Sequence, residues 1–276
     1  MILLGSDPIQ AHLRHLKFKR PYKLHCFSTI DSTNQFLNDL PPNQQLTLCC
    51  TEEQTAGRGR FGRQWRSPFG ENIYFSGRWQ LASSLSKLSG LSLVTGLAIV
   101  ESLKQYTGNE KIQIKWPNDL LWQNKKLGGI LIELNSDKQG VSDVTIGIGL
   151  NVNSDSRINQ LCDNPWCSLL DITGLSFDRN KLIADLIVTV ENHLEQFLAT
   201  GFIAFKPAWE KVDYLNNQWI TVSHPTGKLS GYVQGVNEQG LLCLKEDNET
   251  IHYVSAGEAS LRGQSASRCA LTTAYK

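Results

Sequence analysis

The sequence is poor in the features that mark membrane, secreted and nucleic-acid-binding proteins. Its most apolar run without a charged residue, Leu88–Val100, has 13 residues and includes Ser, Thr and Gly, whereas a bilayer span needs about 20 apolar residues. The formal net charge is +1 over 276 residues, so no overall field favours nucleic acid or an anionic membrane. The opening Met-Ile-Leu-Leu-Gly lacks the basic start and apolar stretch of a signal peptide. We therefore expect a cytoplasmic protein with no membrane partner.

Cysteine usage indicates neither a disulfide framework nor a metal site. The seven cysteines are an odd number, Cys49 and Cys50 are adjacent, and the spacings do not repeat. Cys162 and Cys167 have no second pair nearby, so they do not match a structural zinc site. We expect reduced thiols and no metal-ligand set.

The composition and hydrophobic patterns predict an α+β domain followed by a small β domain. Hydrophobic residues make up 41% and charged residues 19%, as in ordinary globular proteins. Ser32 begins a capped helix that runs to Leu40, with the cap at an exposed end. Helices are also expected over Leu85–Tyr106 and behind an N-cap at Asp178, ending at Gly201. Strands are expected at Leu46–Thr51, Ile73–Trp79, Ile112–Trp116, Leu120–Trp122, Gly129–Leu134 and Val144–Leu150.

Short strands separated by turns follow Tyr214 and predict a β-barrel of about 50 residues. These strands are expected at Trp219–Val222, Leu229–Val236, Leu241–Leu244 and Thr250–Val254. The chain is therefore divided into an N-terminal segment (1–24), a catalytic domain (25–214), the barrel (215–263) and a tail (264–276). A mixed or antiparallel sheet packed by helices is the expected fold of the larger domain.

The stretch Gly57-Arg-Gly-Arg-Phe-Gly62 matches the glycine pattern of a dinucleotide-binding loop. The helix that this motif requires is not expected, because Pro68 and Gly70 follow. A kinase is not indicated either, since no His-Arg-Asp or Asp-Phe-Gly sequence follows. What remains is a loop with arginines at 58, 60, 63 and 66, whose guanidinium groups suit a phosphate and a carboxylate. A solvated basic loop is the alternative.

Two further segments can approach the same ligand. A hairpin with a lysine on each limb is predicted from Lys115-Trp-Pro-Asn-Asp119 and Lys126-Leu-Gly-Gly129. The two adjacent glycines leave room for a ligand to touch the backbone. Gly147-Ile-Gly-Leu-Asn151 ends a buried strand, where missing side chains again permit close approach, although a bulge is the alternative. Each residue also has a purely structural interpretation, such as a turn for Asp119.

Taken together, these segments closely resemble the biotin protein ligase family, in the family's order, from about residue 24 to 262. The resemblance is carried by Ser32-Thr-Asn34, Gln54, Gly57–Trp65, Lys115–Asp119, Lys126–Gly129, Gly147–Asn151 and Gly257–Arg262. It implies a class II synthetase-like catalytic domain and an SH3-like C-terminal barrel. It also implies an ATP-dependent ligase that forms biotinyl-5'-AMP and transfers biotin to a lysine of a biotin carboxyl carrier protein of acetyl-CoA carboxylase.

The resemblance assigns roles to particular residues. The implied biotin-binding residues are Ser32, Thr33, Asn34, Gln54, Gly57, Arg58, Gly59, Arg60, Lys126 and Gly129. The implied catalytic residues are Lys126, Arg60, Lys115 and Asp119. The implied nucleotide-binding residues are Arg60, Arg63, Trp65, Lys115, Asn118, Asn151, Trp166 and Arg262. ATP would act with Mg²⁺, and Asp119 would help to hold this ion or would orient the incoming lysine. Closure of residues 57–66, with Trp65 as a lid, would protect the adenylate from water.

Several alternatives accompany this interpretation. Many bacterial relatives carry a DNA-binding winged helix, but 31 residues precede Ser32, so we expect no repressor activity and interpret Arg14–Lys23 as a solvated entry segment. A lipoyl or octanoyl ligase is the nearest rival function. The Arg, Gly and aromatic residues of 57–66 also fit a single-strand RNA patch. A homodimer is compatible with the resemblance, and the adenylate chemistry needs no covalent enzyme nucleophile.

Overall fold

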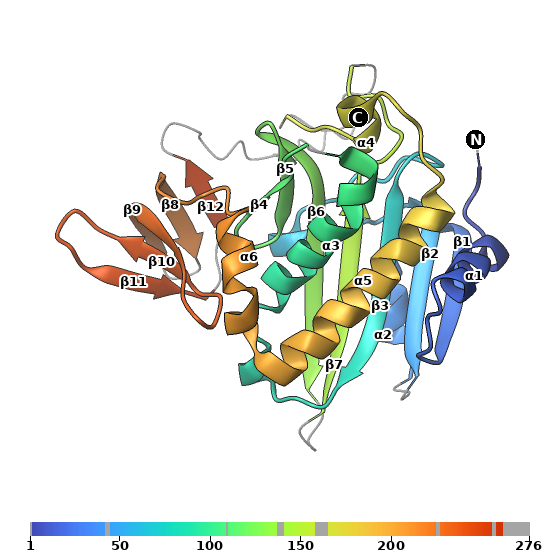
Figure 1. The fold of residues 1–276 in the computed structure, drawn as a ribbon, viewed down its shortest axis with the longest axis horizontal. Coiled ribbons are helices and arrows are strands. Elements are labelled where there is room, and N and C mark those ends of the chain that lie inside the picture. The colour runs from blue at the N-terminus through green and yellow to red at the C-terminus, as the bar shows by residue number, and fades with distance from the viewer. Residues whose placement is uncertain are drawn as a thin grey trace, which may run out of the picture.

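The protein is built around a seven-stranded sheet, beside which lies a smaller five-stranded sheet (Figure 1). The structure is a computed structural model that describes residues 2–41, 45–108, 110–136, 141–157, 165–224, 227–255 and 258–261. The large sheet has the order β1-β2-β3-β7-β6-β5-β4. Its strands are Tyr22–Ile30 (β1), Leu46–Gln54 (β2), Ile73–Leu81 (β3), Gln113–Lys115 (β4), Asp119–Trp122 (β5), Lys125–Ser136 (β6) and Ser142–Leu150 (β7). β1 runs parallel to β2 and the other neighbours are antiparallel, which confirms the mixed α+β fold.

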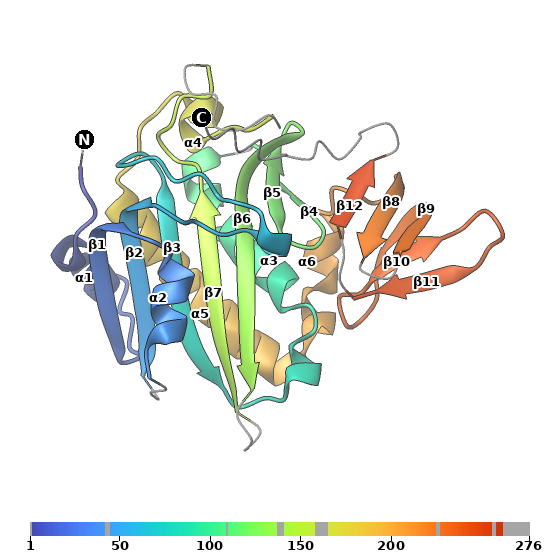
Figure 2. The ribbon, with the colours of Figure 1, turned by 180° about the vertical axis from the view of Figure 1, so that it is seen from behind.

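Helices cover the two faces of the large sheet unequally. α3 (Leu91–Thr107) and α5 (Arg179–Thr200) lie across one face, and α1 (Ser6–His15) packs against α5 (Figure 1). The opposite face carries α2 (Thr33–Asp39). The chain that follows β2 also runs across this face (Figure 2). The short elements are α4 (Leu169–Thr173), α6 (Lys206–Glu210), and the 3-10 turns η1 (Arg60–Gly62), η2 (Leu85–Leu88) and η3 (Phe202–Phe205).

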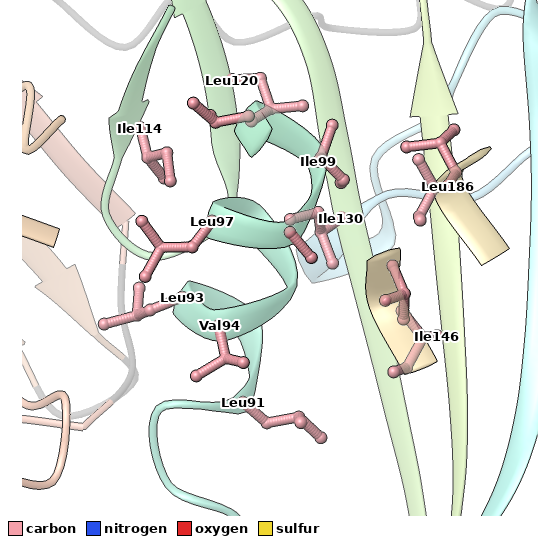
Figure 3. Packing of buried hydrophobic residues seen from close by; sticks show 14 of the residues in the cluster. Leu91, Leu93, Val94, Leu97, Ile99, Ile114, Leu120, Ile130, Ile146 and Leu186 are labelled. Carbon is pink, nitrogen blue, oxygen red and sulfur yellow. The ribbon is translucent and has the colours of Figure 1, made fainter. Parts of the chain in front are cut away.

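The main core lies between the sheet and the two long helices. Alternate residues of β6 and β7 point to this side, where Ile130, Ile146 and Ile148 are almost fully buried. Figure 3 shows Ile130 and Ile146 with Val94 and Leu97 of α3 in this layer. Each such side chain contributes about 1.5–3 kcal/mol when it leaves water. The face of the large sheet that packs against α3 and α5 therefore forms the core, and the other face is available for a ligand.

The smaller sheet has the order β11-β10-β9-β8-β12 and is consistent with an SH3-like domain. Its strands are Trp219–His224 (β8), Gly227–Val236 (β9), Leu242–Lys245 (β10), Ile251–Val254 (β11) and Glu258–Leu261 (β12). It lies beside the β4 edge of the large sheet (Figure 2). Trp116 Nε1 donates to Gly240 O at 3.4 Å, and Ser89 Oγ donates to Gln239 O at 2.8 Å, so specific polar contacts join the two parts.

The structure confirms some expected elements and corrects others. α5 begins after the N-cap Asp178 and ends at Gly201, as predicted. The expected helix over residues 85–106 is interrupted by Gly90, whose φ of 85° is left-handed, so α3 begins only at Leu91. The expected N-terminal segment 1–24 contains α1 and the start of β1. Within the described residues, no helix is long and apolar enough to cross a membrane.

Candidate functional site

The open face of the sheet carries two adjacent glycines where β6 and β7 lie side by side. Gly129 of β6 pairs with Gly149 of β7, and the next row on this face pairs Leu131 with Gly147. A third row pairs Glu133 with Thr145. Because side chains alternate along a strand, all three rows face the same side. The paired glycines therefore form a shallow trough in the sheet surface.

Trp65 fills this trough. A Cβ on Gly149 would lie 2.5 Å from Trp65 Cε2, and one on Gly129 would lie 3.2 Å from Trp65 Cζ3. The ring can rest on the strands only because both positions lack a side chain. Trp65 Nε1 is buried and has no hydrogen-bond partner among the described residues. Gly129 and Gly149 thus allow the close approach of an indole ring, while Gly128 faces Leu120 and Leu150 on the other side of the sheet; the approach of a ligand to these glycines stays a prediction.

Two cations converge on the turn beside the trough. Lys126 Nζ lies 2.7 Å from Asp119 Oδ1 and 5.3 Å from the centre of the Trp65 ring. The Arg60 guanidinium donates to Asn118 Oδ1 at 3.4 Å. Asn118 and Asp119 are adjacent, so Arg60 and Lys126 reach the same place from opposite sides of the turn. Both cationic side chains therefore contact neighbouring residues of one turn.

Local structure fixes these groups. Asn118 Nδ2 donates to Ile130 O at 2.8 Å, and Ile130 N donates to Asn118 O at 3.0 Å, which anchors the turn to β6. The turn between β5 and β6 places Gln123 and Asn124 at φ of 47° and 64°, the left-handed geometry of a tight hairpin. The predicted two-limbed hairpin is thus a three-stranded meander, because β5 separates the lysine-bearing strands β4 and β6. Lys115 ends β4 in register with Asp119.

Asn151 and Trp166 lie behind the backbone of Lys126. Lys126 N donates to Pro165 O at 2.9 Å, next to Trp166, and Asn151 Nδ2 donates to Lys126 O at 3.3 Å and to Cys167 O at 3.0 Å. Both side chains are buried. Burial also raises the pKa of the Cys167 thiol to about 12, so this thiol stays protonated at neutral pH. These residues hold Lys126 in place in the structure.

A chain of polar side chains runs under the loop at the N-terminus of α2. Ser32 caps α2 by accepting from Gln35 N at 3.4 Å. Thr33 N donates to Gln54 Oε1 at 3.0 Å, and Gln54 Nε2 donates to Ser67 Oγ at 3.1 Å. Ser32, Thr33 and Asn34 are each less than 5% exposed, so the expectation of an exposed cap is wrong. The loop after β2 covers this end of the helix.

The loop itself is anchored at both ends. The Arg58 guanidinium donates to both oxygens of Glu133 at 3.0 Å. At Gly57 a Cβ would lie 2.5 Å from Trp65 O, so the two limbs of the loop touch there. Gly59 N donates to Arg63 O at 2.6 Å, which closes the tip, and the Arg63 side chain is exposed. The loop is thus a folded hairpin-like structure with its arginines on different sides.

Sequence reasoning missed three residues of this site: Ser67, Ser76 and Glu133. Ser76 on β3 contacts both Thr33 and Asn34, and Glu133 accepts from Asn34 and Arg58. Single serines and a lone glutamate in a strand give no sequence signal, because their partners lie far away in the chain. Arg262 and Gly257, which the resemblance included, lie outside the described residues.

Comparison with known proteins places this site in a family. The Biotin/lipoate A/B protein ligase family matches residues 26–151, and the biotin protein ligase C-terminal domain matches residues 217–262. Residues 26–151 include the trough, the turn and the arginine loop. The combination of a ligase-type catalytic domain and this C-terminal domain defines the class of protein.

Three individual relatives show which kind of ligase the chain resembles. The chain is 38% identical over 234 residues to the bifunctional ligase/repressor BirA of Escherichia coli, covering 84% of this chain and 72% of that protein. It is 30% identical over 221 residues to a biotin–acetyl-CoA-carboxylase ligase of Paracoccus denitrificans, covering 78% and 91%. The structure of the biotin protein ligase from Aquifex aeolicus in complex with biotin and ATP aligns with a TM-score of 0.74 at 30% identity, covering 87% and 98%. The chain belongs to the biotin protein ligase family, and it is a biotin ligase.

Proposed function

We propose that this enzyme joins biotin to ATP at the site beside the Gly129–Gly149 trough and then transfers biotin to a lysine of a carboxyl carrier protein. The convergence of Arg60 and Lys126 on one turn supports this proposal most directly. The biotin carboxylate must attack the α-phosphate of ATP, and these two groups repel each other. Fixed cations aimed at the developing charge reduce that repulsion, and one preorganised donor is worth about 3–4 kcal/mol.

Lys126 is the residue we assign to the reacting centre. Its ammonium group lies between the Asp119 carboxylate and the Trp65 ring, and the backbone contacts behind it restrict its position. When biotin and ATP bind, Lys126 would face the biotin carboxylate and the α-phosphate, and Arg60 would face them from the loop. Pyrophosphate leaves, and the resulting mixed anhydride is already activated toward an amine, so no covalent enzyme intermediate is needed.

The remaining roles are those that the family resemblance implies. The buried N-terminal end of α2 and Gln54 would surround the biotin ring, with Gly57 and Gly59 allowing its close approach to the backbone. Lys115 and Asn118 would contact the phosphates, and Asp119 would orient the incoming lysine. Arg63, Asn151, Trp166 and Arg262 are assigned to the nucleotide side by resemblance, and these four assignments stay predictions.

The described residues of the site fit an Mg²⁺ ion that arrives with a nucleotide. Among the described residues, no three His, Cys, Asp or Glu side chains cluster to hold a metal. Mg²⁺ often binds through one or two carboxylates together with substrate phosphates. Asp119 can supply such a carboxylate if its ion pair with Lys126 opens. The ion would neutralise phosphate charge. We therefore propose that Mg²⁺ enters with ATP and that Asp119 can contribute a ligand to it.

We propose that the enzyme does not act as a DNA-binding repressor. The N-terminal residues that the structure describes belong to the catalytic fold: Ile9 and Leu13 of α1 are buried, and β1 pairs with β2. Of the basic stretch Arg14–Lys23, Arg20 is bound to the buried Glu191 at 2.7 Å. A gel shift with the protein and a candidate operator should show only salt-sensitive, sequence-independent binding.

ATP/pyrophosphate exchange distinguishes the proposed function from the two alternatives, a lipoyl ligase and an RNA-binding protein. A lipoyl ligase would show ATP/pyrophosphate exchange with lipoate, and an RNA-binding protein would show none with either acid. We expect exchange that requires biotin. Lys126→Ala should lower its rate at least about 100-fold and Arg60→Ala to a comparable degree, because each removes a donor at the transition state. Exchange that is independent of biotin, or near-normal in Lys126→Ala, would refute the assignment.

Transfer is tested separately. Purified biotinyl-5'-AMP, supplied with the enzyme and an isolated carrier domain, should label one carrier lysine without added ATP. A carrier whose target lysine is replaced by Arg is the control, and it should accept no biotin. Equal labelling of both carriers would contradict transfer to a specific lysine.

A further inference from the structure

Two cysteines contact each other across neighbouring strands, outside every role assigned so far. Cys26 of β1 and Cys50 of β2 are partners in the parallel register, and their Sγ atoms lie 3.2 Å apart. Both thiols are free. Cys50 is fully buried in the main core, and Cys26 is half-buried and packs against the same core. The pair therefore lies on the core side of the large sheet, away from the face that carries α2.

The backbone around the two thiols already meets the requirements of a disulfide. A disulfide needs Cα atoms about 4.4–6.8 Å apart and sulfur atoms about 2.05 Å apart. Neighbouring strands lie about 4.7–4.9 Å apart, so two directly paired residues meet the first condition. The two side chains point to the same side, since their sulfur atoms are in contact. A bond between Cys26 and Cys50 therefore requires the sulfur atoms to approach by about 1 Å, while β1 and β2 stay paired.

The two thiols differ in access and in acidity. Among the described residues, Cys26 is the one cysteine that is not buried, and it lies on β1, at the edge of the sheet (Figure 2). A hydrogen bond from Cys50 lowers the pKa of the Cys26 thiol, against the opposing effects of burial and of Glu52. The same bond and complete burial raise the pKa of the Cys50 thiol. Because the thiolate is the form that oxidants attack, Cys26 should react first.

From this arrangement we infer that Cys26 and Cys50 form a reversible oxidation site, in which a peroxide oxidises Cys26 and Cys50 then completes a disulfide. The inference goes beyond the proposed function and does not depend on it. The contact between the sulfur atoms supports it most directly, because an oxidised Cys26 would already have its partner thiol beside it.

The reaction has two steps. The Cys26 thiolate attacks one oxygen of hydrogen peroxide, the O–O bond breaks, and the hydroxide that leaves takes up the proton of the Cys26 thiol to form water. Cys26 is then a sulfenic acid. The Cys50 sulfur attacks the Cys26 sulfur, the S–O bond breaks, and the hydroxyl group leaves as water with the Cys50 proton. The two thiols together lose two electrons, which the peroxide gains.

The disulfide would close a loop of the chain that contains α2, since α2 lies between β1 and β2 in sequence. Closing such a loop restricts the unfolded chain and so stabilises the fold. It would also keep Cys26 from further, irreversible oxidation to a sulfinic acid. The sulfur atoms lie on the core side of the sheet, so the ligand face should change little. We therefore expect an oxidised enzyme that is more stable and still active.

The test treats the whole protein with hydrogen peroxide, blocks the remaining thiols, and maps the disulfides by chymotryptic digestion and mass spectrometry. Cys49 is the internal control, because it is next to Cys50 in sequence but on the opposite face of β2. In the folded protein, links from Cys26 to Cys50 should outnumber links to Cys49 at least about 10-fold. In protein unfolded with urea before treatment, the two links should be within about twofold of each other.

Three variants assign the two steps. Cys26→Ser, a change of similar size at a half-buried position, should form no disulfide with Cys50. Cys50→Ala should stop at the sulfenic acid of Cys26, which dimedone traps. Cys49→Ala is the matched control and should form the disulfide as wild type does.

Stability and activity are measured on wild type before and after oxidation. Oxidation should raise Tm by about 5 °C, and dithiothreitol should reverse the increase. Biotin-dependent ATP/pyrophosphate exchange should stay within about twofold. A fall in Tm on formation of the disulfide would overturn its stabilising role.

Other outcomes would overturn the oxidation site itself. One is a Cys26 that stays reduced at peroxide concentrations that oxidise free glutathione. Another is a Cys26 that becomes a sulfinic acid in folded wild type without linking to Cys50, and a third is equal linkage to Cys49 and Cys50 in the folded protein. A wild type that forms the disulfide but shows no biotin-dependent exchange would overturn the proposed function alone.

Discussion

At the scale of single residues, two glycines that each face a tryptophan should respond differently to the same substitution. In Gly149→Ala the new methyl group would lie 2.5 Å from the Trp65 ring. Trp65 is only partly buried, so it can move out of the trough at little cost in stability. If Trp65 is the lid over bound biotin and its adenylate that we propose, Gly149→Ala should raise the KM for biotin at least about 10-fold, because Trp65 could no longer lie over the trough. Steady-state kinetics measures this, and circular dichroism checks that the fold persists.

Gly77→Ala is the matched comparison. Its methyl group would lie 2.3 Å from Trp79, which is fully buried and cannot move aside. We expect this variant to lose about 1–3 kcal/mol of unfolding free energy, the usual cost of overpacking, with an unchanged KM for biotin in the folded protein. The opposite pattern, with Gly149→Ala unstable and Gly77→Ala defective in binding, would contradict this account of the trough.

Residues within continuous motifs were the most predictable part of the site. Arg60, Lys126 and Asn118 could be assigned to one site because their motifs give them a local chemical signature. Ser76 and Glu133 could not, since each is an ordinary strand residue until the pairing of β3, β6 and β7 sets its neighbours. The burial of the α2 cap was mispredicted for the same reason, because the covering loop follows a different strand.

At the scale of elements, one buried ion pair attaches α5 to the sheet. Arg179, the first residue of α5, donates to Glu52 of β2 at 2.6 Å and to Ile2 O at 2.9 Å, and both charged side chains are almost fully buried. Arg179→Met should lower the unfolding free energy by about 3–5 kcal/mol, because Glu52 would be left as an uncompensated buried charge. Urea denaturation at pH 7.5 measures this loss.

A double variant tests that reason. If the cost comes from the unpaired charge, Arg179→Met with Glu52→Met should be more stable than Arg179→Met alone, since the second change removes the stranded carboxylate. An additive loss in the double variant would show that the two residues act independently. The exchange activity of the folded variants should remain biotin-dependent, because the pair lies outside the ligand site.

Elements with strong helical periodicity could be predicted, while elements defined by tertiary contacts could not. α5 carries a cap and an apolar stripe in its own sequence, and both ends match the prediction. β1 has mixed polar and apolar residues and becomes a strand by pairing with β2, so no local pattern predicts this strand. α3 begins at Leu91 because Gly90 takes a left-handed conformation beside Phe202, a contact between distant segments.

At the scale of the whole molecule, the two sheets meet where a carboxyl group is buried. Asp213 forms a bridge with Ile114 of the large sheet, just before the chain enters the small one. Leu215 N donates to its carboxyl at 3.0 Å and Trp209 Nε1 at 3.2 Å. Desolvation outweighs these donors and raises the pKa of Asp213 from 3.8 to about 6. The joint between the sheets is therefore more stable with a neutral carboxyl than with a charged one.

This gives a prediction for the dependence of stability on pH. The folded-state pKa lies above the unfolded one, so the stability contribution is present at low pH and is lost as pH rises through about 6. Relative to Asp213→Asn, which cannot ionise, wild type should gain about 1.4 kcal/mol of unfolding free energy between pH 7.5 and pH 5, from the two pKa values. Urea denaturation of both proteins at four pH values measures the difference. Asp247→Asn, at an exposed position in the turn between β10 and β11, is the control and should show the same dependence on pH as wild type. If the difference in unfolding free energy between wild type and Asp213→Asn does not change with pH, Asp213 does not ionise in this range. If wild type instead loses stability relative to Asp213→Asn as the pH falls, the charged form of Asp213 is the one that stabilises the joint.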